Sequence, residues 1–181
     1  DGSRWRPDRS IAREAIRRLC RKAAAEAEAD VQAVRLASAA KVMAVETLAR
    51  SDTRLLVDET QWDANPWLLN TQGGVVDLRS GEVHPHDPDL LMSRIAEASP
   101  KEAAPLWNAF LENVTGGDAD LQAYLQRVAG YCLTGTTREH AIFFLLGGGG
   151  NGKSVFTTVL RSVLGDYAAT AASDLLTTSN F

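Results

Sequence analysis

The sequence is poor in cysteine and has no long apolar run. Its two cysteines, Cys20 and Cys132, are too few for a disulfide framework or a zinc site. No stretch reaches the roughly 18 apolar residues that a membrane-spanning helix needs. Residues 1–6 are charged and lack the apolar segment of a secretion signal. These absences predict a cytoplasmic protein with reduced thiols and no membrane partner.

Neither sign of charge dominates, which argues against a uniformly basic nucleic-acid-binding protein. The 181 residues include 19 Lys and Arg against 23 Asp and Glu, and the net charge is −4. Residues 1–50 hold 11 basic and 7 acidic side chains, whereas residues 51–181 hold 8 and 16. This asymmetry predicts that the two parts face different partners.

Residues 1–61 are predicted to form an N-terminal helical region. A first helix, capped by Asp8 or Ser10, is indicated by apolar residues every four positions and by two more that widen this stripe: Ile11, Ala15, Leu19, Ala23 and Ala27, with Ile16 and Cys20. A second helix is indicated by Val31, Val34, Val42, Val45 and Leu48. Because residues 23–30 are rich in Ala and Glu, one long helix is an alternative.

Two groups of side chains within residues 1–137 are candidates for contacts with DNA. Arg13, Arg17 and Arg21 share one side of the first helix and are suited to phosphates, although Glu14 among them also fits a solvated surface. Trp62, Trp67 and Trp107 are able to stack on bases, but the apolar runs beside Trp67 and Trp107 favour core packing. Trp5 is not placed by the sequence.

Residues 62–137 are predicted to hold a small β-hairpin followed by helices. Residues 67–70 and 75–78 form two short strands around Gly73 and Gly74, and residues 82–84 form a returning strand after a turn. His84 and His86 alternate there, but neighbouring prolines fit a strand end better than a metal pair. One helix is predicted to begin at Pro105 and end at Gly116, and Asp118 is predicted to cap the next.

Residues 138–181 contain the pattern that carries chemistry. The apolar run 141–146 predicts a strand buried on both faces of a parallel sheet. Gly147, Gly152, Lys153 and Ser154 then satisfy G-x-x-x-x-G-K-[ST], and an amphipathic helix follows in which Val155, Val159 and Val163 are expected to face the sheet. The order of strand, glycine-rich loop and helix predicts a P-loop that binds ATP and Mg²⁺.

The chemistry follows from the residue types. Backbone N–H groups of the loop and the start of the helix attract phosphate, Lys153 adds a positive charge, and Ser154 offers its hydroxyl to Mg²⁺. The nucleotide-binding residues are predicted to be Gly148, Gly149, Gly150, Asn151, Gly152, Lys153 and Ser154. No later carboxylate ends an apolar strand, because Asp166 lies in a turn and Asp174 at the start of a helix. We therefore assign no catalytic residue and expect this chain alone to hydrolyse ATP poorly.

Four blocks in order resemble the C-terminal part of P4-type phage and plasmid primase-helicases, which are related to the poxvirus D5 NTPase. These blocks are residues 62–70, 74–81, 121–135 and 148–167. The resemblance implies an α+β chain: a mostly helical D5-type collar with a small β-hairpin, then the first strand–P-loop–helix unit of an α/β, AAA+-like ATPase. It also implies a superfamily 3 DNA helicase acting in replication, usually a homo-hexameric ring around DNA. The primase domain, second acidic motif and arginine finger of the family lie outside this sequence.

Two other interpretations remain open. The chain is alternatively a non-catalytic module that oligomerises and contacts DNA, with a P-loop inert in this truncation. In the other interpretation the chain belongs to a P-loop NTPase or small-molecule kinase of another class, although such kinases typically have their P-loop near the N-terminus. Without the rest of its sheet, the strand at 141–146 would expose both edges, and we expect it to be propped by preceding helices, swapped with a neighbour or partly disordered.

Overall fold

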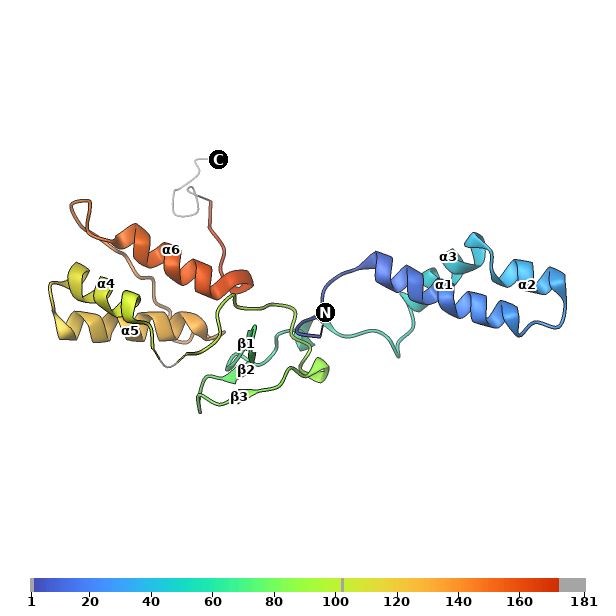
Figure 1. The fold of residues 1–181 in the computed structure, drawn as a ribbon, viewed down its shortest axis with the longest axis horizontal. Helices are drawn as coiled ribbons and strands as arrows, with labels where there is room; N and C mark the ends of the chain where they lie inside the picture. The colour runs from blue at the N-terminus through green and yellow to red at the C-terminus, as the bar shows by residue number, and fades with distance from the viewer. Residues whose placement is uncertain (1, 102, 173–181) are drawn as a thin grey trace. The chain divides into compact units, whose positions relative to one another are not determined.

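A computed structural model describes residues 2–101 and 103–172 (Figure 1). The chain divides into two compact units, which are treated separately. Arg6–Trp62 is called the helical unit, and the described residues among 2–5 and 63–172 are called the sheet unit. Asp174 lies outside the described residues. The chain is α+β and mostly helical, with one small antiparallel sheet among the described residues.

The helical unit contains three helices rather than two. They are α1 (Arg9–Ala25), α2 (Asp30–Leu36) and α3 (Ala39–Ala49), followed by a short 3₁₀ turn, η1 (Glu59–Gln61). Asp8 caps α1, because its Oδ1 accepts from the backbone N–H groups of Ser10 and Ile11 at 2.8 and 3.0 Å. The prediction of one continuous second helix is wrong. Ser38 caps α3 by accepting from the N–H of Lys41 at 3.2 Å, and its hydroxyl donates to the carbonyl of Arg35.

The buried side of α1 also differs from the prediction. Cys20 in α1 and Val42 in α3 are buried, whereas Ile11 and Leu19 are 70% and 60% exposed. The sequence carries two apolar stripes on α1, and the one through Ile16 and Cys20 faces the interior. An ion pair joins Arg13 Nε to Glu46 Oε2 of α3 at 2.9 Å.

The sheet unit is organised around strands β1 (Leu68–Thr71), β2 (Gly74–Asp77) and β3 (Val83–His84), in the antiparallel order β1-β2-β3. Leu69 pairs with Val76, and Val75 pairs with His84. The predicted hairpin and returning strand are therefore confirmed. Gly74 is required because a Cβ there would lie 2.4 Å from the carbonyl oxygen of His84.

A small core lies against this sheet. Leu69, Val76 and Ala96 form it, with Leu78, Leu133 and Tyr167 packed around them. Ala96 belongs to residues 94–97, which run beside β1: the N–H of Ala96 donates to the carbonyl of Asn70 at 2.8 Å. A 3₁₀ turn, η2 (Pro88–Leu90), precedes this segment.

The predicted helices after the sheet are present. They are α4 (Pro105–Thr115), which ends at left-handed Gly116, and α5 (Ala119–Leu133), which Asp118 caps. The last helix among the described residues is α6 (Lys153–Leu164), followed by a 3₁₀ turn, η3 (Gly165–Tyr167). Trp107 of α4 is partly buried and stacks on Phe156 of α6 with ring centroids 5.6 Å apart, which is consistent with the packing role expected for this ring.

The strand predicted at 141–146 is not formed. These residues have no regular secondary structure, and Ile142, Phe144 and Leu146 are 67%, 71% and 89% exposed. A strand needs a hydrogen-bonded neighbour, and no other described segment pairs with this one. The prediction that Val155, Val159 and Val163 of α6 face a sheet is also wrong, because the expected strand beside α6 is not formed. Phe156 and Leu164 are buried instead, whereas Val155 and Val163 are exposed.

Candidate nucleotide-binding site

The glycine-rich loop at 147–152 leads directly into α6. Gly149, Gly150 and Gly152 have φ of 96°, 63° and 80°, a region that favours glycine, so the backbone curls tightly before the helix begins at Lys153. No side chain caps this helix. The first N–H groups of α6 are therefore left without side-chain acceptors, and the positive end of the helix dipole lies at the loop. This local geometry fits a phosphate group.

Lys153 and Asn151 form a contact that bridges the two ends of the loop. Lys153 Nζ donates to the carbonyl of Gly147 at 3.1 Å and to Asn151 Oδ1 at 2.5 Å. A Cβ at Gly147 would lie 2.0 Å from Asn151 Nδ2, so a larger residue there would require the Asn151 side chain to move. The sequence marks Asn151 as a loop residue but does not indicate this contact. Ser154 is the second residue of α6 and is exposed.

A groove of about 420 Å³ lies beside the loop. Asn151, Gly152 and Lys153 line one part of it, and mainly apolar side chains of α4, α5 and residues 142–146 line the rest. The loop packs on α4, because a Cβ at Gly152 would lie 2.5 Å from Val114 Cγ1. No carboxylate is among the described residues that line the groove. The residues present thus fit phosphate, whereas for Mg²⁺ they offer the hydroxyl of Ser154.

The far end of α6 is hydrogen-bonded to the segment beside β1. The N–H of Asp166 donates to the carbonyl of Ile95 at 3.1 Å, and the N–H of Ile95 donates to Asp166 Oδ2 at 3.2 Å. Arg4 forms an ion pair with the same carboxylate. Tyr167 Oη accepts from the N–H of Asn70 at 3.2 Å, and burial raises the pKa of this phenol. The sequence indicates only a turn here, and it gives no signal for these long-range bonds.

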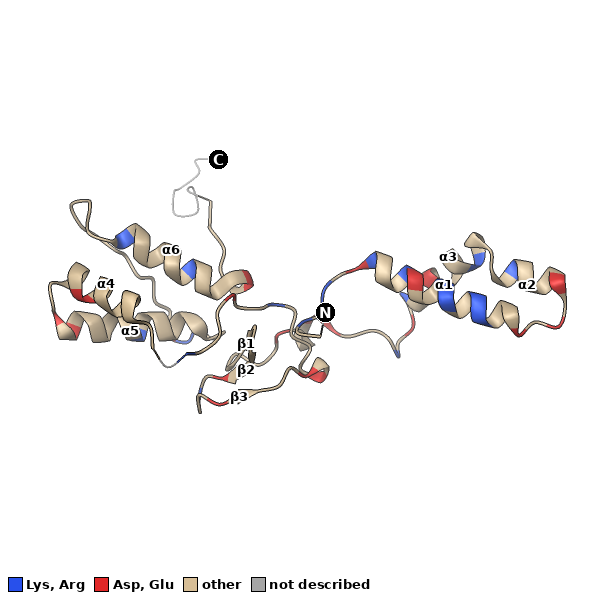
Figure 2. Ribbon diagram, viewed as in Figure 1, with Lys and Arg blue, Asp and Glu red and all other residues tan. Residues whose placement is uncertain are grey.

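The three arginines proposed for DNA lie on α1 of the helical unit, where the ribbon in Figure 2 is coloured blue for Lys and Arg in several places. The hydrogen bond to Glu46 raises the pKa of Arg13 and lowers that of Glu46. Arg17 and Arg21 lie 3.5 and 3.9 Å from the carboxylate of Glu14. Each arginine therefore has an acidic neighbour that reduces its positive potential toward a phosphate chain.

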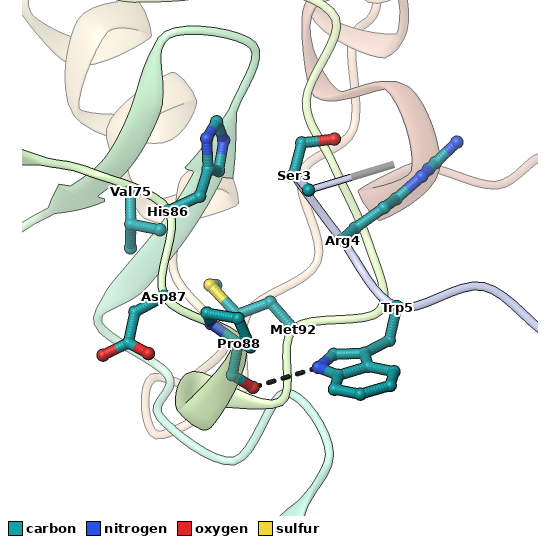
Figure 3. A pocket seen from close by; sticks show the side chains of 9 residues that line it. Ser3, Arg4, Trp5, Val75, His86, Asp87, Pro88 and Met92 are labelled. Carbon is teal, nitrogen blue, oxygen red and sulfur yellow. Dashed lines mark hydrogen bonds between the residues drawn. The ribbon is translucent and has the colours of Figure 1, made fainter.

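A second, smaller cavity of about 230 Å³ lies in the sheet unit (Figure 3). Trp5, which the sequence does not place, lines it: its Nε1 donates to the carbonyl of Pro88 at 3.0 Å. His86 also lines it, and its Nε2 lies 2.9 Å from the carbonyl oxygen of Thr71. Across the described residues, no group of three or more His, Cys, Asp or Glu side chains is arranged to hold a metal ion.

The helices described by the structure include none with the length and apolarity needed to cross a bilayer. The fold is that of a mostly helical α+β module that places a small sheet before a glycine-rich loop and its helix. Residues 1–116 match the family model described as "D5 N terminal like". The chain belongs to this family. The match begins at residue 1, so it includes the helices before Trp62. The four sequence blocks that resemble primase-helicases begin only at residue 62.

One curated relative comes from Acanthamoeba polyphaga mimivirus and is named "Putative helicase L207/L206". It is 31% identical over 110 residues, which are 58% of this chain and 11% of the relative. The chain thus spans about a tenth of the length of the protein that it matches.

Proposed function

We propose that this chain is part of an ATP-dependent DNA helicase that acts in replication, of the P4-type primase-helicase kind. Membership of the D5 N terminal like family and the name of the mimivirus relative support a helicase-associated N-terminal region. In this proposal α1–α5 with the sheet form the collar, and residues 147–154 open a superfamily 3 ATPase. The full protein would assemble as a homo-hexamer on single-stranded or forked DNA.

The observation that carries the nucleotide site is the loop geometry. Left-handed glycines, an uncapped helix and a lysine positioned across the loop together favour the phosphates of ATP. Lys153 would contact the β- and γ-phosphates, Gly148–Gly152 would offer N–H groups, and the Ser154 hydroxyl would hold Mg²⁺. Bound Mg²⁺ would neutralise charge that develops on the phosphates.

The groove also supports a second candidate, a collar that binds without hydrolysing. Hydrolysis needs a carboxylate to hold the metal and orient water, and no described residue that lines the groove supplies one. We therefore expect ATP binding to be separable from turnover in this chain. Turnover would require residues supplied by the full-length protein.

The test is ATP turnover by the full gene product, with and without single-stranded DNA, beside Lys153→Ala. Turnover that rises with DNA and disappears in Lys153→Ala supports the helicase. Turnover that ignores DNA contradicts the helicase and leaves an NTPase or kinase of another class. Binding of a non-hydrolysable ATP analogue without any turnover supports the non-catalytic collar.

A further inference from the structure

The first surface of interest is the side of α1 that the helical unit leaves exposed. Ile11 and Leu19 are 70% and 60% exposed, and Ala15 lies between them at helical spacing. Arg18 and Lys22 are also exposed and lie in the neighbouring row of α1, where Arg18 is 3.7 Å from the carboxylate of Glu14 and Lys22 forms no ion pair with a described residue. We call these five residues the basic-edged stripe. It is separate from the row of Arg13, Arg17 and Arg21, which occupies another side of α1.

The second surface lies on α2 and on the turn before it. Val31 and Val34 are 68% and 71% exposed. The exposed carboxylates of Glu28 and Asp30 lie three residues and one residue before Val31, and neither forms an ion pair with a described residue. We call these four residues the acid-edged patch. Its apolar centre and negative edge complement the basic-edged stripe in both hydrophobicity and charge.

The two surfaces do not satisfy one another within one molecule. Both remain exposed although α1 and α2 are neighbours, because the interior of the helical unit is filled from the opposite side of α1, through Cys20 and Val42. A packed helix with a second apolar stripe that faces water has a further surface available for burial against a partner. Apolar contacts with charges of opposite sign at their edge are typical of interfaces between proteins.

We propose that the basic-edged stripe of one copy docks on the acid-edged patch of a second copy of this chain. Leu19 and Ile11 would lie against Val31 and Val34, and Arg18 and Lys22 would face Glu28 and Asp30. Because a copy presents both surfaces, each copy is able to make the contact twice. The inference rests on the self-association proposed above and names the surfaces that would mediate it.

Charge reversal tests the contact without disturbing the interior. Three variants of the full chain are compared by sedimentation equilibrium: Arg18→Glu with Lys22→Glu, Glu28→Lys with Asp30→Lys, and all four changes together. We expect wild type to self-associate and each double variant to lose at least about tenfold in association constant, because like charges then oppose. A mixture of the two double variants, and the quadruple variant alone, should regain association because opposite charges again meet.

Arg9→Glu with Lys41→Glu is the matched control. It reverses two exposed charges of the helical unit that lie outside the stripe and the patch, so association should be unchanged. Circular dichroism checks that every variant is folded. A wild-type chain that stays monomeric, or double variants that do not recover on mixing, overturns the proposal. The proposed nucleotide site is tested separately by binding of an ATP analogue, so a failure of self-association is distinguishable from a failure to bind nucleotide.

Discussion

Gly165 joins α6 to η3, and its replacement by alanine should be among the most destabilising small changes in the sheet unit. Its backbone has φ 55° and ψ −120°, a conformation that residues with a Cβ rarely adopt. An added Cβ would lie 2.8 Å from the carbonyl oxygen of Ile95 and 3.1 Å from the amide nitrogen of Glu97. Both atoms belong to backbone, so neither is able to swing away as a side chain would.

The magnitude follows from two contributions. The strained conformation costs about 1–3 kcal/mol. Moving the segment would also weaken hydrogen bonds from Asp166 to Ile95 and from Glu97 to Val163, each 3.1 Å long, and each contributes about 1 kcal/mol. We therefore expect Gly165→Ala to lower the free energy of unfolding by about 3 kcal/mol.

Two other glycines provide matched controls. Gly81 has φ 79° but open space around its Cβ position, so Gly81→Ala should cost about 1–2 kcal/mol from backbone strain alone. Gly130 lies inside α5 with ordinary φ and open space, so Gly130→Ala should stabilise by about 0.5–1 kcal/mol.

Urea unfolding followed by tryptophan fluorescence measures these differences. Trp5, Trp67 and Trp107 lie in the sheet unit and report on it. The expected order of stability is Gly130→Ala above wild type, then Gly81→Ala, then Gly165→Ala. A Gly165→Ala variant as stable as Gly81→Ala would refute the close packing of η3 on residues 94–97.

Three further predictions concern a pH effect, the loop and DNA. Burial raises the pKa of Tyr167 in the folded chain above its ordinary 10.0. The stability that depends on the neutral phenol is therefore fully present below pH 10 and falls as the pH rises further, and Tyr167→Phe should reduce this fall in the free energy of unfolding at alkaline pH. An equal fall in wild type and Tyr167→Phe would contradict the prediction. Asn151→Asp places a negative charge beside Lys153 and close to where the phosphates would bind, so calorimetry should show ATP-analogue affinity reduced about tenfold, and unchanged affinity would oppose the assigned contact. Reversing Arg13, Arg17 and Arg21 together should weaken single-strand binding at low salt and lower its salt dependence by about 0.7 per lost phosphate contact; unaltered affinity would remove them as DNA ligands.

Several elements follow from residues close together in the chain. Asp8 and Asp118 cap α1 and α5, Pro105 begins α4, and the glycines around residue 74 permit the β1–β2 turn. These signals act within a few residues, because caps, turns and backbone freedom are local properties. The sequence accordingly predicts the hairpin, α4, α5, α6 and the composition of the glycine-rich loop.

Other features depend on partners distant in the chain. Residues 141–146 have the apolarity of a buried strand, but a strand requires a hydrogen-bonded neighbour that its own residues do not supply. Leu19 and Cys20 are both apolar but only Cys20 is buried, because the packing of α1 against α2 and α3 decides which stripe of α1 faces the interior. The docking of Asp166 and Tyr167 beside β1 joins residues more than 70 positions apart. Periodicity identifies the apolar surfaces of such elements, whereas the choice of surface to bury depends on packing between them.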